Sequence, residues 1–159
     1  MTKKICSKKQ ESMIADFLGW SVVSGSGARP NSPGDVVSDS WLGECKTHVE
    51  PSHKILFNFA TWDKIEEEAS SRFKFPAYFV DDGSQKAENT WVMFSSAFLD
   101  NCIIIKYPLS YRKNIIFSSD DLKKSMNDAS KNSKNVVYEV LRSRSILYLT
   151  DLITFENLL

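Results

Sequence analysis

Residues 24–47, SGSGARPNSPGDVVSDSWLGECKT, decide the expected fold. The stretch opens with a loop of glycine and serine, carries an acid at Asp35 and ends on an alternating acid and base, Glu44 and Lys46. Side chains along a β-strand alternate between its two faces. If the segment WLGECKT is extended, Glu44 and Lys46 therefore point to one side of the strand and Cys45 to the other.

The two acids and the lysine indicate metal chemistry. Carboxylates brought into one cleft repel each other unless a cation lies between them, and hard oxygen ligands favour Mg²⁺ or Mn²⁺. A lysine two residues along the strand would lie beside that cation, where it could orient a water or stabilise charge developing on a phosphate. The stretch predicts metal-assisted hydrolysis of a phosphodiester.

The flanking segments predict an α/β fold with a central mixed β-sheet flanked by helices. Hydrophobic periodicity and turn residues distinguish the expected helices from the expected strands. Helices are expected over 8–20, 55–73, from 120 onward and from 151 to 159, and strands over 20–24, 35–37, 41–47, 76–80, 91–94, 102–105 and 146–149; residues 136–141 are apolar and ambiguous.

Glu11 falls within the first expected helix. It precedes Ile14 by three residues and Leu18 by seven, so it shares the helix face that turns toward the core. A carboxylate on that face needs a partner. Glu11 either complements the positive end of the helix dipole or belongs to the same site as the other acids.

Gly34-Asp35 followed by Glu44-Cys45-Lys46 resembles the motif of the PD-(D/E)XK nuclease superfamily. The chain is similar, more narrowly, to the archaeal-type Holliday junction resolvases, which pair a glutamate on an N-terminal helix with a Ser-Gly-Ser-Gly segment ahead of the aspartate. Residues 24–27 supply that segment here. The resemblance covers roughly residues 8–108. Pro33-Gly34 stands where the family usually has a proline directly before the acid.

This resemblance implies a restriction-endonuclease-like core and a Mg²⁺-dependent (or Mn²⁺-dependent) endodeoxyribonuclease that cuts four-way junctions in DNA recombination and repair. Asp35, Glu44 and the backbone carbonyl of Cys45 would ligate the metal. Lys46 would be the catalytic lysine, and Glu11 would complete the site. Because resolving a junction requires two symmetry-related nicks, we expect a homodimer.

DNA binding must come from a local patch of basic residues, because 20 basic and 20 acidic residues give a net charge of zero. The glycine-serine loop could approach a sugar-phosphate chain closely, although such loops are also simple linkers. The expected DNA contacts are Ser24, Ser26 and Arg29 of the loop with Lys8, Lys9 and Lys54, and Lys3 and Lys4 lie near them.

Length predicts a single nuclease-like domain over residues 1–159. Within it, residues 110–159 form a C-terminal addition that either closes the sheet or serves dimerisation or junction binding. Residues 91–98 or 151–159 are the expected dimer surface. Glu66, Glu67 and Glu68 are expected to form a solvated helix face, and His48 and His53 to lie on the surface or face DNA; three cysteines without paired spacing indicate reduced thiols.

No stretch approaches eighteen apolar residues and the N-terminus lacks the apolar core of a signal peptide, so we expect a cytoplasmic protein without a membrane partner. Two other functions fit the same residues. One is a PD-(D/E)XK nuclease of restriction or repair type that acts on linear or flapped DNA. The other is a noncatalytic DNA-binding or protein-interaction module of the same fold.

Overall fold

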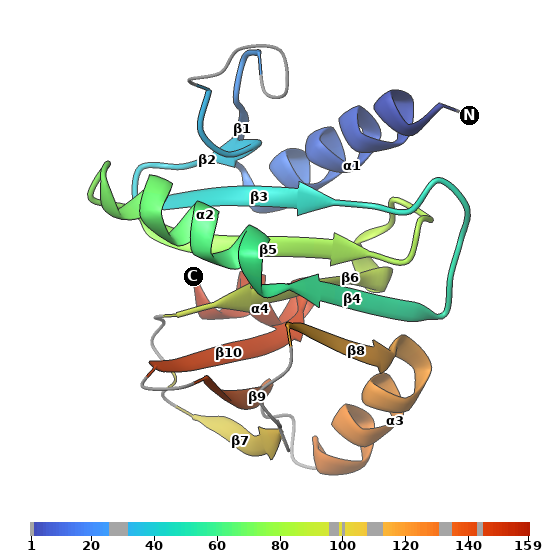
Figure 1. Cartoon of the computed structure of the whole chain (residues 1–159). Coiled ribbons are helices and arrows are strands. Elements are labelled where there is room, and N and C mark those ends of the chain that lie inside the picture. Colours follow the sequence, from blue (N-terminus) through green and yellow to red (C-terminus); the bar gives the residue numbers. More distant parts are fainter. Residues whose placement is uncertain are drawn as a thin grey trace.

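An eight-stranded mixed sheet forms the centre of the molecule (Figure 1). The computed structural model describes residues 2–25, 32–95, 99, 101–107, 113–130, 135–142 and 145–159. The strand order is β1-β2-β3-β5-β6-β10-β9-β7, and β3–β5 and β7–β9 are the parallel pairs. The strands are β1 (Ser21–Val22), β2 (Val36–Val37), β3 (Trp41–Lys46), β5 (Phe75–Asp81), β6 (Thr90–Phe94), β7 (Cys102–Tyr107), β9 (Asn135–Arg142) and β10 (Ser145–Asp151).

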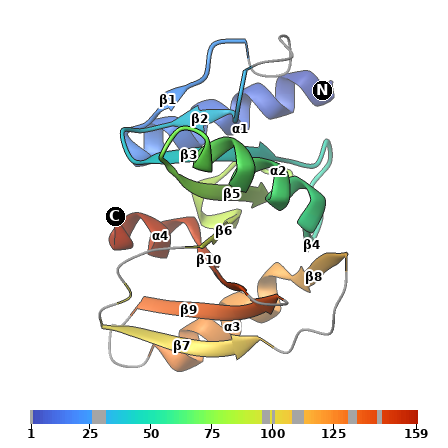
Figure 2. The ribbon, with the colours of Figure 1, turned by 60° about the vertical axis from the view of Figure 1, so that its left-hand side comes forward.

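A smaller antiparallel sheet joins β4 (Lys54–Asn58) to β8 (Asn114–Ser118). The helices are α1 (Lys3–Leu18), α2 (Phe59–Ser70), α3 (Ser119–Ala129) and α4 (Leu152–Leu158), with a 3₁₀ turn, η1 (Ala87–Asn89), before β6. Figure 2 shows β1 to β3 at one end of the main sheet and β9 and β7 at the other. The expected α/β class with a mixed sheet flanked by helices is confirmed.

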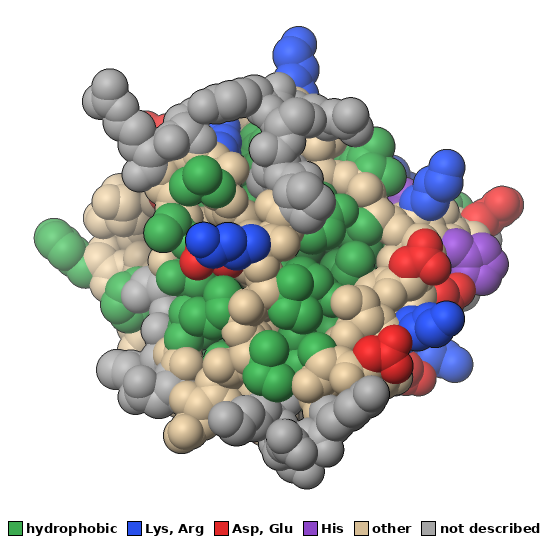
Figure 3. Space-filling view, turned by 90° about the horizontal axis from the view of Figure 1, so that it is seen from below, with side chains coloured by type: hydrophobic (Ala, Val, Ile, Leu, Met, Phe, Trp, Pro, Cys, Tyr) green, Lys and Arg blue, Asp and Glu red, His purple; other side chains and the backbone are tan. Residues whose placement is uncertain are grey.

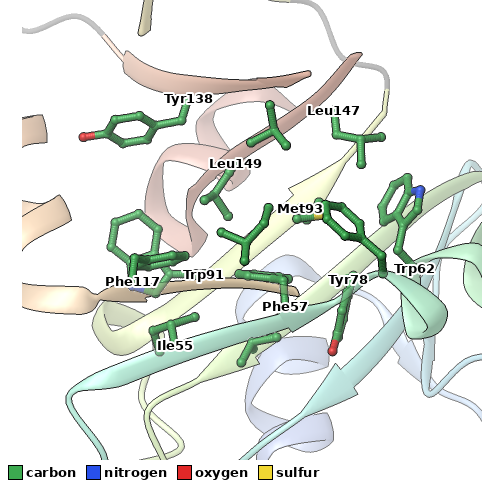
Figure 4. Packing of buried hydrophobic residues seen from close by; sticks show 14 of the residues in the cluster. Ile55, Phe57, Trp62, Tyr78, Trp91, Met93, Phe117, Tyr138, Leu147 and Leu149 are labelled. Atoms are coloured by element: carbon green, nitrogen blue, oxygen red, sulfur yellow. The ribbon is translucent and has the colours of Figure 1, made fainter. Parts of the chain in front are cut away.

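Helices cover both faces of the main sheet. Side chains of α1 and α4 pack with Cys45 and Phe79 on one face, whereas α2 packs with Leu42 and Tyr78 on the other. Neighbouring strand residues thus belong to opposite clusters, as strand alternation requires. In Figure 4, side chains from β4, β5, β6, β8 and β10 point toward one another to form the cluster on the α2 face.

The first helix begins earlier than expected, at Lys3, and ends at Leu18. Gly19 ends it in the left-handed conformation, with φ of 68°, and its N–H donates to the carbonyl of Ala15. Gln10, Glu11 and Ile14 lie on its buried face. The prediction that Glu11 turns toward the core is confirmed.

The single helix expected over residues 55–73 is wrong. Residues 54–58 form β4, where Ile55 and Phe57 are buried on one side in period-two alternation, and α2 begins only at Phe59. Asn58 separates the two elements, because its side chain accepts a hydrogen bond of 2.8 Å from the Ala60 N–H and caps the helix. Phe73, the last residue of the expected helix, lies beyond α2 and is 98% exposed.

The C-terminal segment contributes to the same sheet as the motif strands. β10 lies between β6 and β9, and β8 pairs with β4. The ambiguous residues 136–141 belong to strand β9. Ser118 caps α3 by accepting from the Asp121 N–H, and Asp151 caps α4 by accepting from the Thr154 N–H, so the helices expected from 120 and from 151 begin within one residue of those positions. None of the helices in the described ranges is long and apolar enough to cross a membrane.

Exposed apolar side chains lie at the end of the sheet farthest from the motif strands. Ile104, Leu141 and Ile146 of β7, β9 and β10 are each more than 40% exposed. Figure 3 shows hydrophobic side chains gathered in the middle of one face of the molecule and charged side chains toward one side of it. The dimer surface expected at residues 91–98 is wrong for residues 91–94, because β6 is a central strand whose residues are all buried, and residues 96–98 lie outside the described residues.

Candidate active site

One cavity of about 480 Å³ brings the four predicted catalytic residues together. Glu11 reaches it from α1, Asp35 from the residue before β2, and Glu44 and Lys46 from β3. The cavity is lined by Lys3, Lys4, Ser7, Lys8, Glu11, Ser32, Gly34, Asp35, Glu44, Cys45, Lys46, Thr47 and Lys64. Residues far apart in sequence therefore share one concave surface.

The cavity forms where strand β3 loses its neighbour. β2 pairs only with Leu42 and Gly43, so within the described residues the rest of β3 has a strand partner on its β5 side alone. The Asp35 N–H donates to the Gly43 carbonyl at 2.7 Å, and the Asp35 carboxylate accepts from the Cys45 N–H at 2.8 Å. Backbone of β3 thus fixes the position of the Asp35 carboxylate.

Glu44 and Lys46 lie on the same face of β3, as alternation predicted, and their side chains form an ion pair. The ammonium of Lys46 also lies 3.3 Å from the backbone carbonyl oxygen of Cys45. The Cys45 side chain points to the opposite face, into the cluster that contains Ile14 and Phe79. One cation therefore already contacts the carboxylate and the carbonyl that the family resemblance assigned to a metal.

Burial and neighbouring charges shift the pKa values of Asp35 and Lys46. Burial and the neighbouring charge of Glu44 raise the pKa of Asp35 from 3.8 to about 6, although the Cys45 N–H and Lys46 act in the opposite direction. Burial alone would lower the pKa of Lys46, but the charge and hydrogen bond of Glu44 raise it, so the lysine stays protonated. Glu11 adds to the negative field at Asp35.

Cys45 contributes to the site through its backbone. Burial, followed by the charges of Asp35, Glu11 and Glu44, raises the pKa of its thiol well above the usual value. The thiol therefore stays neutral, and nucleophilic thiolate chemistry is disfavoured.

The donor set suits a hard cation. Among the described residues, no group of three or more His, Cys, Asp and Glu side chains is arranged to hold a metal ion by itself. Mg²⁺ seldom needs such a cage, because it keeps several waters and takes one or two carboxylates together with substrate phosphates. Asp35, Glu44 and the Cys45 carbonyl are oxygen ligands of that kind.

Gln10 attaches helix α1 to the end of β3. Its side-chain N–H₂ donates to the Lys46 carbonyl at 2.7 Å, and the residue is fully buried. This contact brings the neighbouring Glu11 to the cavity. The helical pattern of the sequence placed Gln10 next to Glu11 but gave no indication that its amide would reach Lys46.

The expected DNA contacts divide into three groups. Lys8 lines the cavity, as do Lys3 and Lys4. Ser24, Lys9 and Lys54 are exposed and lie outside the cavity lining. The remaining two, Ser26 and Arg29, lie outside the described residues.

The expected solvated face of α2 is wrong for Glu68. Glu66 and Glu67 are exposed, but the Glu68 carboxylate accepts from the Gly34 N–H at 3.1 Å and pairs with Lys64. His53 lies on the surface as expected, with its Nδ1 3.4 Å from a carboxylate oxygen of Asp120. Lys64 and Glu68 carry no sequence signal beyond their place on the polar side of a helix.

Comparisons with protein-family models, with curated proteins and with solved structures find no match to this chain. The class of the protein therefore rests on the residues of the cavity.

Proposed function

We propose that this protein is a divalent-metal-dependent DNA endonuclease with a restriction-endonuclease-like core, and that it resolves branched DNA. The observation that carries the proposal is the convergence of Glu11, Asp35, Glu44 and Lys46 on one cavity at the open edge of β3. Glu11 comes from α1, outside the motif strands, so its presence in the same cavity as the motif residues supports the proposal.

Asp35, Glu44 and the Cys45 carbonyl would hold Mg²⁺ or Mn²⁺ in this cavity. The ion would lower the pKa of a bound water and neutralise charge on the scissile phosphate. Lys46 is protonated and half-exposed, so it can exchange its contact with Glu44 for a phosphate oxygen and stabilise the charge that develops during hydrolysis. Glu11, which lines the same cavity from α1, can orient a water or a second hydrated cation.

The rim of the cavity supports a polyanionic substrate. Lys3, Lys4 and Lys8 approach it from α1, and Lys64 from α2, so lysines flank the acids on two sides. With a net charge of zero, the chain has no general attraction for nucleic acid. The lysines of α1 and α2 beside these acids would instead bind a phosphate backbone that passes over the cavity.

The branched substrate and the homodimer are proposed from the family resemblance, and one set of site residues in each chain is compatible with both. Each chain carries one set of Glu11, Asp35, Glu44 and Lys46, which suffices to cut one strand. Two chains related by a twofold axis would present two such sets to the symmetric arms of a junction. Nucleases that act on linear or flapped DNA would use the same cavity, so the substrate must be measured.

The test compares a four-way junction, a flapped duplex, a linear duplex and a single strand of matched sequence in one Mg²⁺ buffer. We expect paired nicks in the junction, no cleavage in excess EDTA, and binding without appreciable cleavage in Ca²⁺. Asp35→Asn and Glu44→Gln should lose both metal binding and cleavage, whereas Lys124→Ala on α3 should behave as wild type. Robust cleavage in EDTA, or none of any substrate with Mg²⁺ or Mn²⁺, would overturn the proposal.

A further inference from the structure

Helix α2 also contributes to the lining of the cavity, although it is not part of the motif. Its single lysine, Lys64, lines the same cavity as Asp35 and Glu44. The Lys64 side chain is 62% exposed, so its ammonium is accessible to a ligand. Lysines of α1 line the cavity as well, and a bound polyanion would be contacted from both helices.

Glu68, one turn along α2, makes two contacts with its two carboxylate oxygens. Oε1 lies 3.6 Å from the Lys64 ammonium, and Oε2 accepts a 3.1 Å hydrogen bond from the Gly34 N–H. Three quarters of the Glu68 side chain is buried, its exposed fraction being 25%. One carboxylate thus links the exposed lysine to the backbone immediately before Asp35.

The Gly34 backbone has little freedom to move. Its φ of +64° lies in the left-handed region, and a Cβ there would meet the Leu42 side chain at 2.9 Å and the Gly43 carbonyl at 3.0 Å. The next residue, Asp35, is bonded through its own N–H to Gly43. β3 therefore holds this turn on one side, and Glu68 holds it on the other.

We propose that Lys64 contacts a phosphate of the DNA substrate and that Glu68 is a positioning residue, which holds both Lys64 and the Gly34–Asp35 backbone. The inference deepens the proposed function and rests on it for the identity of the ligand. Through Lys64 and Glu68, helix α2 then links the contact with DNA to the position of Asp35, the proposed metal ligand. A phosphodiester is the ligand because the lysine faces a cavity that also contains hard-cation ligands.

The positioning role is tested by Glu68→Ala and Glu68→Gln, with Glu67→Ala on the exposed face as the matched control. A glutamine oxygen can still accept from the Gly34 N–H, whereas alanine cannot. In metal-free protein we expect amide exchange at Gly34 to rise at least tenfold in Glu68→Ala and to stay near wild type in Glu68→Gln and Glu67→Ala. Mg²⁺ affinity, measured by calorimetry, should fall several-fold in Glu68→Ala only. Unchanged exchange at Gly34 in Glu68→Ala would overturn the positioning role.

The phosphate contact is tested by Lys64→Ala, with Lys124→Ala as the control for the loss of one exposed lysine. In Ca²⁺, affinity for a four-way junction should fall about three- to tenfold and the salt dependence of binding should lose about one unit of slope. Mg²⁺ affinity of the DNA-free protein should not fall, because loss of a neighbouring positive charge does not weaken cation binding. An unaltered salt slope, or a wild-type protein that binds no DNA, would overturn the contact.

Failure of the proposed endonuclease activity and failure of the Lys64 contact would give different results. If the wild type binds DNA but never cleaves it, the proposed endonuclease fails while the Lys64 contact is still measured by binding. If the wild type cleaves DNA but Lys64→Ala matches it in affinity and salt slope, only the further inference fails. Amide exchange at Gly34 needs neither DNA nor cleavage, so it decides the role of Glu68 in every case.

Discussion

At the residue scale, substitution of Lys46 should affect the rate of cleavage far more than the stability of the fold. Lys46→Ala should lower kcat about 10²- to 10³-fold, because the ammonium stabilises charge that develops on the phosphate. Stability should change little, because 49% of the lysine side chain is exposed and an ion pair of this kind contributes at most about 1 kcal/mol.

Cleavage kinetics and thermal unfolding measure the two effects of Lys46→Ala. Lys124→Ala is the matched control, since Lys124 is exposed and outside the cavity lining. Wild-type cleavage by Lys46→Ala, with unchanged metal affinity, would show that the pair has been assigned the wrong role.

Ionisation of the buried carboxyl of Asp81 should make the stability of the fold depend on pH. It is fully buried, and its Oδ1 accepts from the Thr47 hydroxyl and the Gly83 N–H, whereas its Oδ2 has no hydrogen-bond partner among the described residues. Burial raises its pKa despite those hydrogen bonds. A carboxyl whose folded pKa is raised stabilises the fold below its unfolded pKa, and this stability is lost as the pH rises through the folded pKa.

We therefore expect the unfolding free energy of Asp81→Asn, relative to wild type, to increase as the pH rises from about 4 toward 8. The increase should be on the order of 1 kcal/mol for each unit by which the pKa of Asp81 is raised. Urea unfolding of both proteins at several pH values measures it. A difference that stays constant with pH would contradict the prediction.

At the scale of elements, alanine substitutions at two glycines distinguish the stability cost of steric crowding from that of backbone strain. A Cβ at Gly43 would lie 2.6 Å from Phe79 and 2.7 Å from Val36, both fully buried, so Gly43→Ala should cost about 1–3 kcal/mol through overpacking. Gly19 has φ of +68° but open space around it, so Gly19→Ala should cost about 1–2 kcal/mol through strain alone.

Both glycine variants should melt at lower temperature, by about 2–4 °C per kcal/mol. Only Gly43→Ala should also weaken Mg²⁺ binding, because the Gly43 carbonyl holds the Asp35 N–H. Equal Mg²⁺ affinity of the two variants, measured by calorimetry, would show that β3 does not position the acid.

The sequence predicted those elements whose periodicity was clean and local. Strand alternation placed Glu44 and Lys46 on one face, and helical spacing turned Glu11 inward. The strand β4 was missed because its apolar residues continue smoothly into those of α2, and only the cap at Asn58 divides them. Lys64 and Glu68 could not be predicted as site residues, because their role depends on how α2 packs beside the turn at Gly34.

At the scale of the whole molecule, we expect a homodimer at micromolar concentration. Sedimentation of the protein, free and with a four-way junction, measures the assembly. Mixing wild-type chains with Lys46→Ala chains sharpens the test, because mixed dimers should nick a junction on one strand instead of resolving it. Lys124→Ala chains, as the control, should resolve it normally. A monomer under both conditions would exclude paired cutting and favour a nuclease that nicks single strands.

The position of β10 also constrains the order of folding. β10 follows every other described strand along the chain, yet it lies between β6 and β9 inside the main sheet. Until residues 145–151 emerge, β6 has an open edge, and the buried side chains of Trp91 and Met93 lack the cover of Leu147 and Leu149. A nascent chain therefore carries Asp35 and Glu44, the proposed metal ligands, before it can complete the main sheet, and this interval is when we expect the protein to be most exposed to aggregation and proteolysis.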